Sequence, residues 1–181
     1  SRQKYLYLPE EHNDFIFAIV CEELGRVCAS HSAIFSVHVT GMKSILFFGS
    51  EEQKRALLPP MARGEIRWCQ GFSEPNAGSD LASLKASAVD AGDHFLVNGT
   101  KIWTSYGDKS DWMYALVRTD PTAPKHRGIS LIVLDMQSPG ITVTPIDLIS
   151  GKSSFCQVFF DNVKVPKENL VYEENKGWDV A

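Results

Sequence analysis

The hydrophobic pattern of this chain changes near Ile66, and this change constrains the fold more than any other feature. Before Ile66, apolar residues recur every three or four positions, as they do along one face of an α-helix. After it, short apolar-rich runs, alternating in residues 94–105, are separated by glycine, proline and aspartate, which is typical of successive β-strands. The sequence therefore predicts an α+β chain, in which a helical bundle fragment precedes a small antiparallel β-barrel or sandwich.

Two long helices are expected first. Residues 10–30 carry apolar side chains on one side and acidic and basic ones on the other. Residues 32–49 are apolar on nearly all sides, so we expect a buried helix there. Gly41 lies within this second helix, where it either weakens the helix or admits a close neighbour.

A third, shorter helix is expected directly afterwards. Gly49 stops the preceding helix, and Ser50 begins a Ser-x-x-Gln pattern that is typical of a capping box. Acidic residues follow in the first turn and basic ones after them, which suits the helix dipole. We expect Pro59 and Pro60 to end this helix.

Six or seven short strands with tight turns are expected in the second part of the chain. Asn98-Gly99 is the strongest short hairpin signal, so we expect residues 94–105 to form two strands joined there. Further runs that predict strands from their spacing and their separation by glycine, proline and aspartate cover residues 111–119, 128–136, 140–148 and 155–165.

Composition excludes several classes of protein. The 181 residues are 44% hydrophobic and 22% charged, as in an ordinary soluble globular protein, and the net charge of −4 argues against nucleic-acid binding. No apolar run is long enough for a transmembrane segment, and residues 1–14 lack the order of a secretory signal. The four cysteines are scattered without a C-x-x-C pair, so we expect no metal site and an intracellular, reducing setting.

The segment GFSEPNAGSD, residues 71–80, is too irregular for a helix and too poor in apolar residues for a buried strand. It is either an ordinary loop, in which serines bond their own backbone, or a surface of N–H and hydroxyl groups that holds a polar ligand. We do not expect Glu74 and Asp80 to form an acid–base pair. Glu74 is expected to pair with a basic side chain, and Asp80 to cap the turn that follows.

Five segments in a fixed order resemble the acyl-CoA dehydrogenase family over nearly all of the chain. They are GSEEQKRALLPPMARGE, GFSEPNAGSDLASL, VNGTKIWTS, RTD and FFDNVKVPKENLV…NKGW. The resemblance implies a partial N-terminal helical domain at residues 1–66, a middle β-domain at 67–166 and the start of a C-terminal helical domain at 167–181, whose remainder is absent. It also implies FAD as cofactor, acyl-CoA as substrate, an electron-transfer flavoprotein or similar acceptor, and a homo- or hetero-tetramer.

The resemblance further implies which residues hold the cofactor. Ser73 matches the residue whose hydroxyl and backbone contact the isoalloxazine, and Gln70, Gly71 and Phe72 lie beside it. Ser79 matches the serine that lies where the flavin and the pantetheine arm of the substrate meet. Ser79 is therefore expected to bind both cofactor and substrate.

A second segment, KIWTS, supplies the other half of the implied site. Trp103 matches the aromatic residue that packs against the isoalloxazine, and Ser105 matches the hydroxyl residue near flavin O4 and N5. Alternation along a strand places these two side chains on the same face, while Thr104 contributes through its backbone. Taken alone, a tryptophan in a strand is more often a core residue.

The activity implied is α,β-desaturation of an acyl-CoA thioester. In family members the base is a glutamate of the C-terminal helical domain, so no catalytic residue is assigned in this chain. The alternatives are a flavin monooxygenase or nitroalkane oxidase of the same fold, and a non-catalytic subunit of a hetero-oligomeric dehydrogenase. Residues 125–127 are expected to form a basic surface loop, with contact to CoA phosphates or to a neighbouring subunit as alternatives. The expected location is the cytoplasm, or the mitochondrial matrix in a eukaryote.

Overall fold

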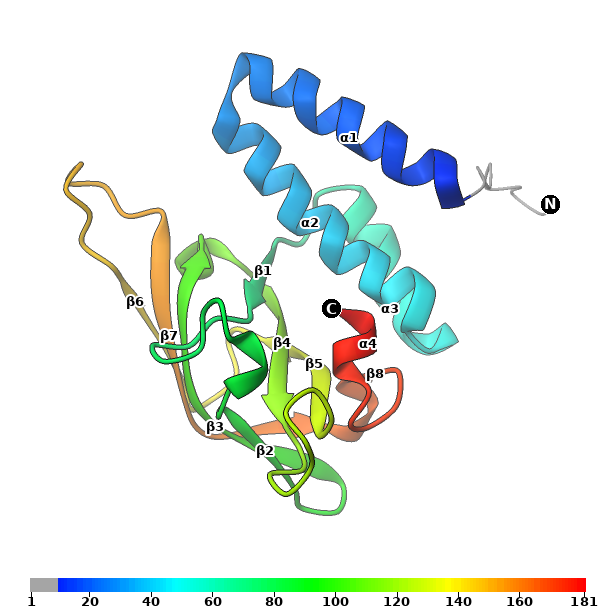
Figure 1. Cartoon of the computed structure of the whole chain (residues 1–181), viewed down its shortest axis with the longest axis vertical. Helices are drawn as coiled ribbons and strands as arrows, with labels where there is room; N and C mark the ends of the chain where they lie inside the picture. The colour runs from blue at the N-terminus through cyan, green and yellow to red at the C-terminus, as the bar shows by residue number, and fades with distance from the viewer. Residues whose placement is uncertain (1–9) are drawn as a thin grey trace. The chain divides into compact units, whose positions relative to one another are not determined.

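The computed structural model describes residues 10–181 (Figure 1). The sequence predicts no secretory signal in residues 1–14, and residues 1–9 of this segment lie outside the described residues. Two compact units are present, one ending at Val39 and the other beginning at Thr40, and each is described by itself. None of the helices in residues 10–181 combines the length and the hydropathy that crossing a membrane requires.

The first unit contains the two long helices that the sequence predicts. Helix α1 is Glu10–Val27, and the first part of α2 (Ala29–Phe48) runs to the unit boundary. The rings of Phe17 and Phe35 stack with centroids 5.9 Å apart. Ser32 Oγ donates a hydrogen bond to the Cys21 carbonyl at 2.8 Å. Side-chain contacts between α1 and α2 thus hold this unit together.

The second half of α2 is less buried than its composition suggests. Its buried residues are Gly41, Ser44 and Ile45. Leu46 and Phe47 are 43% and 42% exposed, so the expectation of a helix buried on nearly all sides is wrong. An apolar side chain becomes buried only where another element covers it, and only one side of this half of α2 is covered. Gly41 does admit a close neighbour, because a Cβ there would lie 3.1 Å from the Tyr114 ring.

Helix α3 (Glu51–Ala62) begins as predicted and ends later. The Gln53 amide donates to Ser50 Oγ at 3.2 Å, and the Ser50 amide donates to Gln53 Oε1 at 3.0 Å, which confirms the capping box. The helix does not end at Pro59 and Pro60 but includes both. A proline lacks the N–H donor but keeps its carbonyl, and the Arg63 amide donates to the Pro59 carbonyl at 3.2 Å. Two prolines are therefore tolerated in this last turn.

The second unit contains one sheet of eight strands in the order β6-β7-β3-β2-β4-β5-β8, with β1 paired to β4. The strands are β1 (Trp68–Gly71), β2 (Ser87–Asp90), β3 (His94–Ser105), β4 (Trp112–Arg118), β5 (Ile129–Asp135), β6 (Ile141–Pro145), β7 (Phe155–Pro166) and β8 (Leu170–Val171). Two pairs, β1–β4 and β2–β4, are parallel, and the others are antiparallel. Short helical segments are η1 (Leu81–Ser83), η2 (Gly107–Lys109), η3 (Lys167–Asn169) and α4 (Gly177–Val180).

One hydrophobic core lies inside this sheet. Ile132 and Leu134 of β5 belong to the same buried cluster as Val158 and Phe160 of β7, although β5 and β7 lie near opposite ends of the strand order. The sheet must therefore curl around its own core, and Figure 1 shows its strands bending in this way. This arrangement confirms the predicted α+β fold with a small, mostly antiparallel β-domain.

The expected hairpin at Asn98-Gly99 is wrong. Strand β3 continues through both residues and pairs with β7, with a shift of register between Val97 and Gly99. The actual turn lies between β2 and β3, where Gly92 has a φ of +96°. Gly99 has a φ of +139°, and a Cβ there would lie 2.7 Å from the Ala86 Cα atom. A bulge and a hairpin turn can both require a positive φ, so the same dipeptide suits either.

Candidate functional site

The segment 71–80 is a bend built around one tight turn. The Glu74 amide donates to the Ala77 carbonyl at 3.0 Å, and the Ala77 amide donates to the Glu74 carbonyl at 3.0 Å. Pro75 and Asn76 occupy the two corner positions, where proline presets the backbone and asparagine tolerates the turn. The bend therefore has a defined shape that its own residues specify.

Strand β3 holds this bend from a distant part of the chain. The Ile102 amide donates to the Ser73 carbonyl at 2.9 Å. Lys101 Nζ donates to the Phe72 carbonyl at 3.0 Å. The two segments in which the sequence predicts a site thus lie against each other, with Ser73 bonded to the residue before Trp103.

A buried ion pair reinforces this junction. Lys101 Nζ lies 2.8 Å from Glu74 Oε1, with side-chain exposures of 0% and 9%. The Glu74 carboxylate also accepts hydrogen bonds from the amides of Lys85 at 2.7 Å and Ala86 at 2.8 Å. Burial lowers the pKa of Lys101, while the Glu74 carboxylate acts in the opposite direction by favouring the ammonium. The expectation that Glu74 pairs with a basic side chain is confirmed, and its partner comes from β3.

Trp103 lies at a bulge in β3 and is not a core residue. The pairing of β3 with β7 shifts register between Lys101 and Thr104, and Trp103 has a φ of +59°. The residue is 55% exposed, and its indole meets the Phe155 ring edge-on, with centroids 6.2 Å apart. Thr104 is only 1% exposed, whereas Ser105 is half-buried. A strained backbone that presents a large aromatic side chain to the surface is typical of a binding site.

Thr104 carries an unusual polar atom. Its Oγ1 is buried and has no hydrogen-bond partner within residues 10–181. The same holds for Nε1 of Trp68 in this part of the chain. A buried polar group without a partner costs free energy, so each is a position where a bound molecule or water could supply the missing bond.

The other predicted site residues differ in exposure. Gln70 is half-buried and Gly71 is buried at the end of β1, and Phe72 is half-buried after it. A Cβ on Gly71 would lie 2.4 Å from Met113 Sδ, so packing inside the domain explains this glycine. Ser79 is exposed at the far end of the bend.

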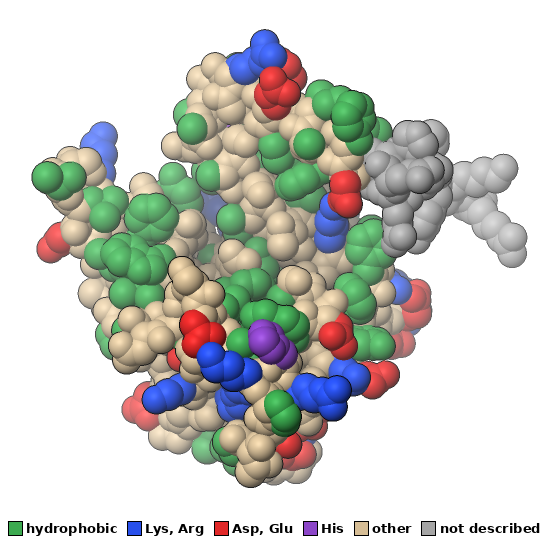
Figure 2. All heavy atoms as spheres, viewed as in Figure 1, with side chains coloured by type: hydrophobic (Ala, Val, Ile, Leu, Met, Phe, Trp, Pro, Cys, Tyr) green, Lys and Arg blue, Asp and Glu red, His purple; other side chains and the backbone are tan. Residues whose placement is uncertain are grey.

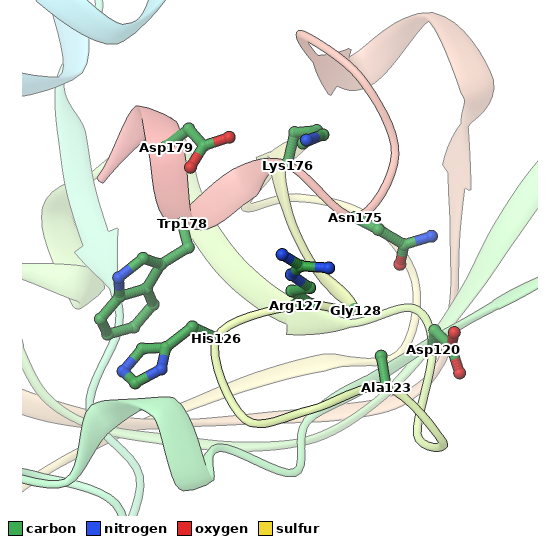
Figure 3. A pocket seen from close by; sticks show the side chains of 9 residues that line it. All are labelled: Asp120, Ala123, His126, Arg127, Gly128, Asn175, Lys176, Trp178 and Asp179. Atoms are coloured by element: carbon green, nitrogen blue, oxygen red, sulfur yellow. The ribbon is translucent and has the colours of Figure 1, made fainter.

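A pocket of about 450 Å³ lies between the β4–β5 connection and the segment that leads into α4 (Figure 3). It is lined by Asp120, Ala123, His126, Arg127, Gly128, Asn175, Lys176, Trp178 and Asp179. The rings of His126 and Trp178 meet edge to face with centroids 4.8 Å apart, and Figure 3 shows them side by side. On the face seen in Figure 2, basic side chains and a histidine gather over the β-domain, with acidic ones among them. The sequence predicts only the basic loop of this pocket, because the other wall comes from residues far along the chain.

An ion pair links this pocket to the bend. Lys125 Nζ, in the pocket loop, lies 2.6 Å from Asp80 Oδ2. Asp80 precedes η1, but its side chain makes no capping hydrogen bond, so the expected cap is wrong. The carboxylate pairs with Lys125 instead. The pocket and the bend therefore belong to one continuous surface of the domain.

Comparison with known proteins agrees with this arrangement. The family model for the middle domain of acyl-CoA dehydrogenases matches residues 69–163, more than half of the chain, and the model for their N-terminal domain matches residues 9–65. This chain belongs to the acyl-CoA dehydrogenase family.

Individual acyl-CoA dehydrogenases support the assignment. Acyl-CoA dehydrogenase FadE34 of Mycobacterium tuberculosis is 50% identical over 76% of this chain and 19% of its own length. An acyl-CoA dehydrogenase structure from Geobacillus kaustophilus matches with a TM-score of 0.84 and 36% identity, over 91% of this chain and 44% of that one. The ChsE4-ChsE5 complex from Mycobacterium tuberculosis matches with a TM-score of 0.73 and 40% identity, over 76% of this chain and 36% of that one. The chain thus spans less than half the length of these relatives.

Proposed function

We propose that this chain supplies part of the cofactor and substrate site of an FAD-dependent acyl-CoA dehydrogenase. The observation that carries the proposal is the junction of the bend with β3, where Ser73 is bonded to Ile102 and the exposed Trp103 follows. Tryptophan offers a flat apolar surface, and backbone and hydroxyl groups offer hydrogen bonds to the polar edge of a ring system. Both kinds of group occur at this one junction.

The residues of this junction fit an isoalloxazine ring. Trp103 is exposed, Ser105 is half-buried, and the buried Oγ1 of Thr104, the residue between them in sequence, has no hydrogen-bond partner within residues 10–181. When bound, FAD accepts a hydride from the β-carbon of the acyl chain while a base removes the α-proton. We propose as cofactor-binding residues Gln70, Gly71, Phe72, Ser73, Ser79, Trp103, Thr104 and Ser105.

The path of the substrate follows from the ion pair at the end of the bend. Ser79 precedes Asp80, which pairs with Lys125 at the pocket loop. Arg127 and Lys176 line the pocket beside Asp120 and Asp179, and these two cations are the side chains there that attract the phosphate groups of CoA. We therefore propose that the pantetheine arm passes Ser79 and that the phosphates bind in the pocket.

No residue of this chain is proposed as the base. The family resemblance implies a glutamate from a C-terminal helical domain, and a positioned base contributes roughly 10²–10⁴-fold to rate. We therefore expect the 181-residue chain alone to be inactive or nearly so in forming enoyl-CoA. The electrons are proposed to pass to an electron-transfer flavoprotein or similar acceptor, in a tetrameric enzyme.

The test is anaerobic mixing of acyl-CoA with the full-length protein loaded with FAD. Bleaching of the visible flavin absorption, with formation of one enoyl-CoA per flavin, is the expected result. Flavin that stays oxidised under every acyl-CoA tested, but turns over with oxygen and another electron donor, would overturn the proposed reaction and favour a monooxygenase.

A second candidate function is that of a non-catalytic subunit, which contributes half of the cofactor site in a complex with a different chain. It is favoured by the similarity to the ChsE4-ChsE5 complex, which consists of two different proteins. Flavin stoichiometry separates the two possibilities. Binding of one FAD per chain by a homo-oligomer of the full-length protein supports the complete dehydrogenase. FAD binding only after a different chain is added supports the non-catalytic subunit.

A further inference from the structure

The backbone on both sides of Ser73 is held by two consecutive residues of β3. Lys101 Nζ donates to the Phe72 carbonyl at 3.0 Å, and the Ile102 amide donates to the Ser73 carbonyl at 2.9 Å. Both carbonyl groups that flank the Ser73 Cα are therefore fixed. The orientation of Ser73 is set by the residues that immediately precede Trp103.

A buried ammonium such as that of Lys101 is an unusual donor to a backbone carbonyl. Its side chain is 0% exposed, and its partner Glu74 is 9% exposed. Removing two charges from water is costly, and well-packed apolar side chains often give equal or greater stability. Stability alone therefore does not explain a lysine at this position. The hydrogen bond from its ammonium to the Phe72 carbonyl does explain it.

The peptide group that contains the Phe72 carbonyl also contains the Ser73 N–H, so a cation at the carbonyl oxygen affects this N–H. The peptide bonds of the described residues are trans, so the Ser73 N–H points away from the carbonyl that Lys101 binds. A positive charge at the oxygen draws electron density and makes the N–H a stronger donor, most of all at a buried site. The Ser73 amide has no backbone acceptor among the described residues. It is thus a fixed donor, directed away from Lys101.

We propose that Lys101 is a positioning residue, which orients and polarises the Ser73 amide toward the isoalloxazine of FAD. A polarised donor stabilises an acceptor more strongly as that acceptor gains negative charge. Lys101 thereby favours binding of reduced FAD over binding of oxidised FAD. This inference rests on the proposed function and adds a residue that does not itself touch the cofactor.

The informative variant is the double substitution Lys101→Met with Glu74→Gln. Lys101→Met alone would leave a buried carboxylate without its cation, which destabilises a protein for reasons unrelated to FAD. The double variant is neutral at both positions and keeps a carbonyl to accept from one of the amides of Lys85 and Ala86. Lys167→Met is the matched control, because Lys167 pairs with Asp90 at 2.7 Å outside the bend.

The main readout is the ratio of the affinity for reduced FAD to that for oxidised FAD, measured on the full-length protein. We expect the double variant to lower this ratio severalfold, because the Ser73 amide would keep its bond to FAD but lose its polarisation by the cation, and Lys167→Met to leave it unchanged. If Lys101 only balanced the charge of Glu74, the double variant would keep the wild-type ratio. That result would overturn the inference.

A second readout needs no cofactor. In ¹⁵N-labelled protein, the amide proton resonance of Ser73 should move upfield in the double variant and stay in place in Lys167→Met. Failure of the wild-type protein to bind FAD would overturn the proposed function and the redox preference, while the resonance would still decide whether Lys101 polarises Ser73. An unchanged resonance in a protein that binds FAD normally would overturn the inference and leave the proposed function standing.

Discussion

The Ile102 amide donates a hydrogen bond to the Ser73 carbonyl at 2.9 Å and so joins the bend after β1 to the bulged end of β3. This hydrogen bond determines where the next residue, Trp103, lies relative to the bend. Trp103 follows Ile102 with a φ of +59° and projects its indole to the surface, beside the bend that carries Ser73. A flat aromatic surface and a row of backbone groups are thereby placed next to each other.

Gly41 lies where the second half of α2 packs against Tyr114 of β4, so its substitution tests how tight this contact is. A Cβ there would lie 3.1 Å from the Tyr114 ring, which is 1% exposed and is met edge-on by Phe72. We expect Gly41→Ala to lower the free energy of unfolding by roughly 1 kcal/mol, because overpacking costs roughly 1–3 kcal/mol and alanine regains about 1 kcal/mol of helix propensity. Urea denaturation followed by circular dichroism measures this change.

The matched control for that prediction is Gly25→Ala in α1. Its Cβ would have no atom closer than the Ser32 Cβ at 3.9 Å, so only the propensity gain applies. We expect this variant to be stabilised. Equal stabilisation by Gly41→Ala would show that Tyr114 can move aside.

Cys69 should make stability depend on alkaline pH. Burial raises the pKa of its thiol from 9.0 to about 12. Between these values the folded thiol keeps its proton and the unfolded thiol loses it, so the free energy of unfolding falls as pH rises, by up to about 1.4 kcal/mol per unit. Cys69→Ala removes this contribution. Denaturation at several pH values in this window should give a shallower decline for the variant, and parallel curves would contradict the prediction.

The pocket should contribute to CoA binding. Arg127→Ala and Lys176→Ala are each expected to weaken the affinity for CoA by roughly 3- to 10-fold, because a charged contact to phosphate is lost at a site that salt still screens. Calorimetric titration at low and high salt measures this, and the loss should be larger at low salt. Lys164→Ala, an exposed lysine of β7, is the control. An equal loss in that variant would mean that general surface charge, not the pocket, attracts CoA.

Several local signals in the sequence predicted local structure correctly. The capping box of Ser50 and Gln53 involves residues three apart, so its pattern is sufficient to predict the hydrogen bonds that form. The short apolar-rich runs bounded by glycine, proline and aspartate likewise predicted β4, β5, β6 and β7, because strand burial leaves a direct mark on the sequence; β4 and β5 are buried on both faces. The general fold followed from these elements.

Interactions between distant residues could not be predicted in the same way. Asn98-Gly99 suits a hairpin and a bulge equally, and only the pairing of β3 with β7 decides between them. No local pattern shows that Lys101 reaches Glu74, or that Asp80 pairs with Lys125 instead of capping η1. The site residues came from family resemblance, and their roles toward FAD remain a prediction.

The most direct test of the proposed site is titration of the full-length protein with FAD, followed by flavin fluorescence, in wild type and in Trp103→Leu. Tyr172→Leu is the control, because Tyr172 is also exposed, at 45%, and also has a positive φ, of +68°. Loss of aromatic stacking and apolar contact predicts about tenfold weaker binding for Trp103→Leu and no change for Tyr172→Leu. Wild-type affinity in Trp103→Leu would contradict the proposal that the bend and the bulged strand together hold the cofactor.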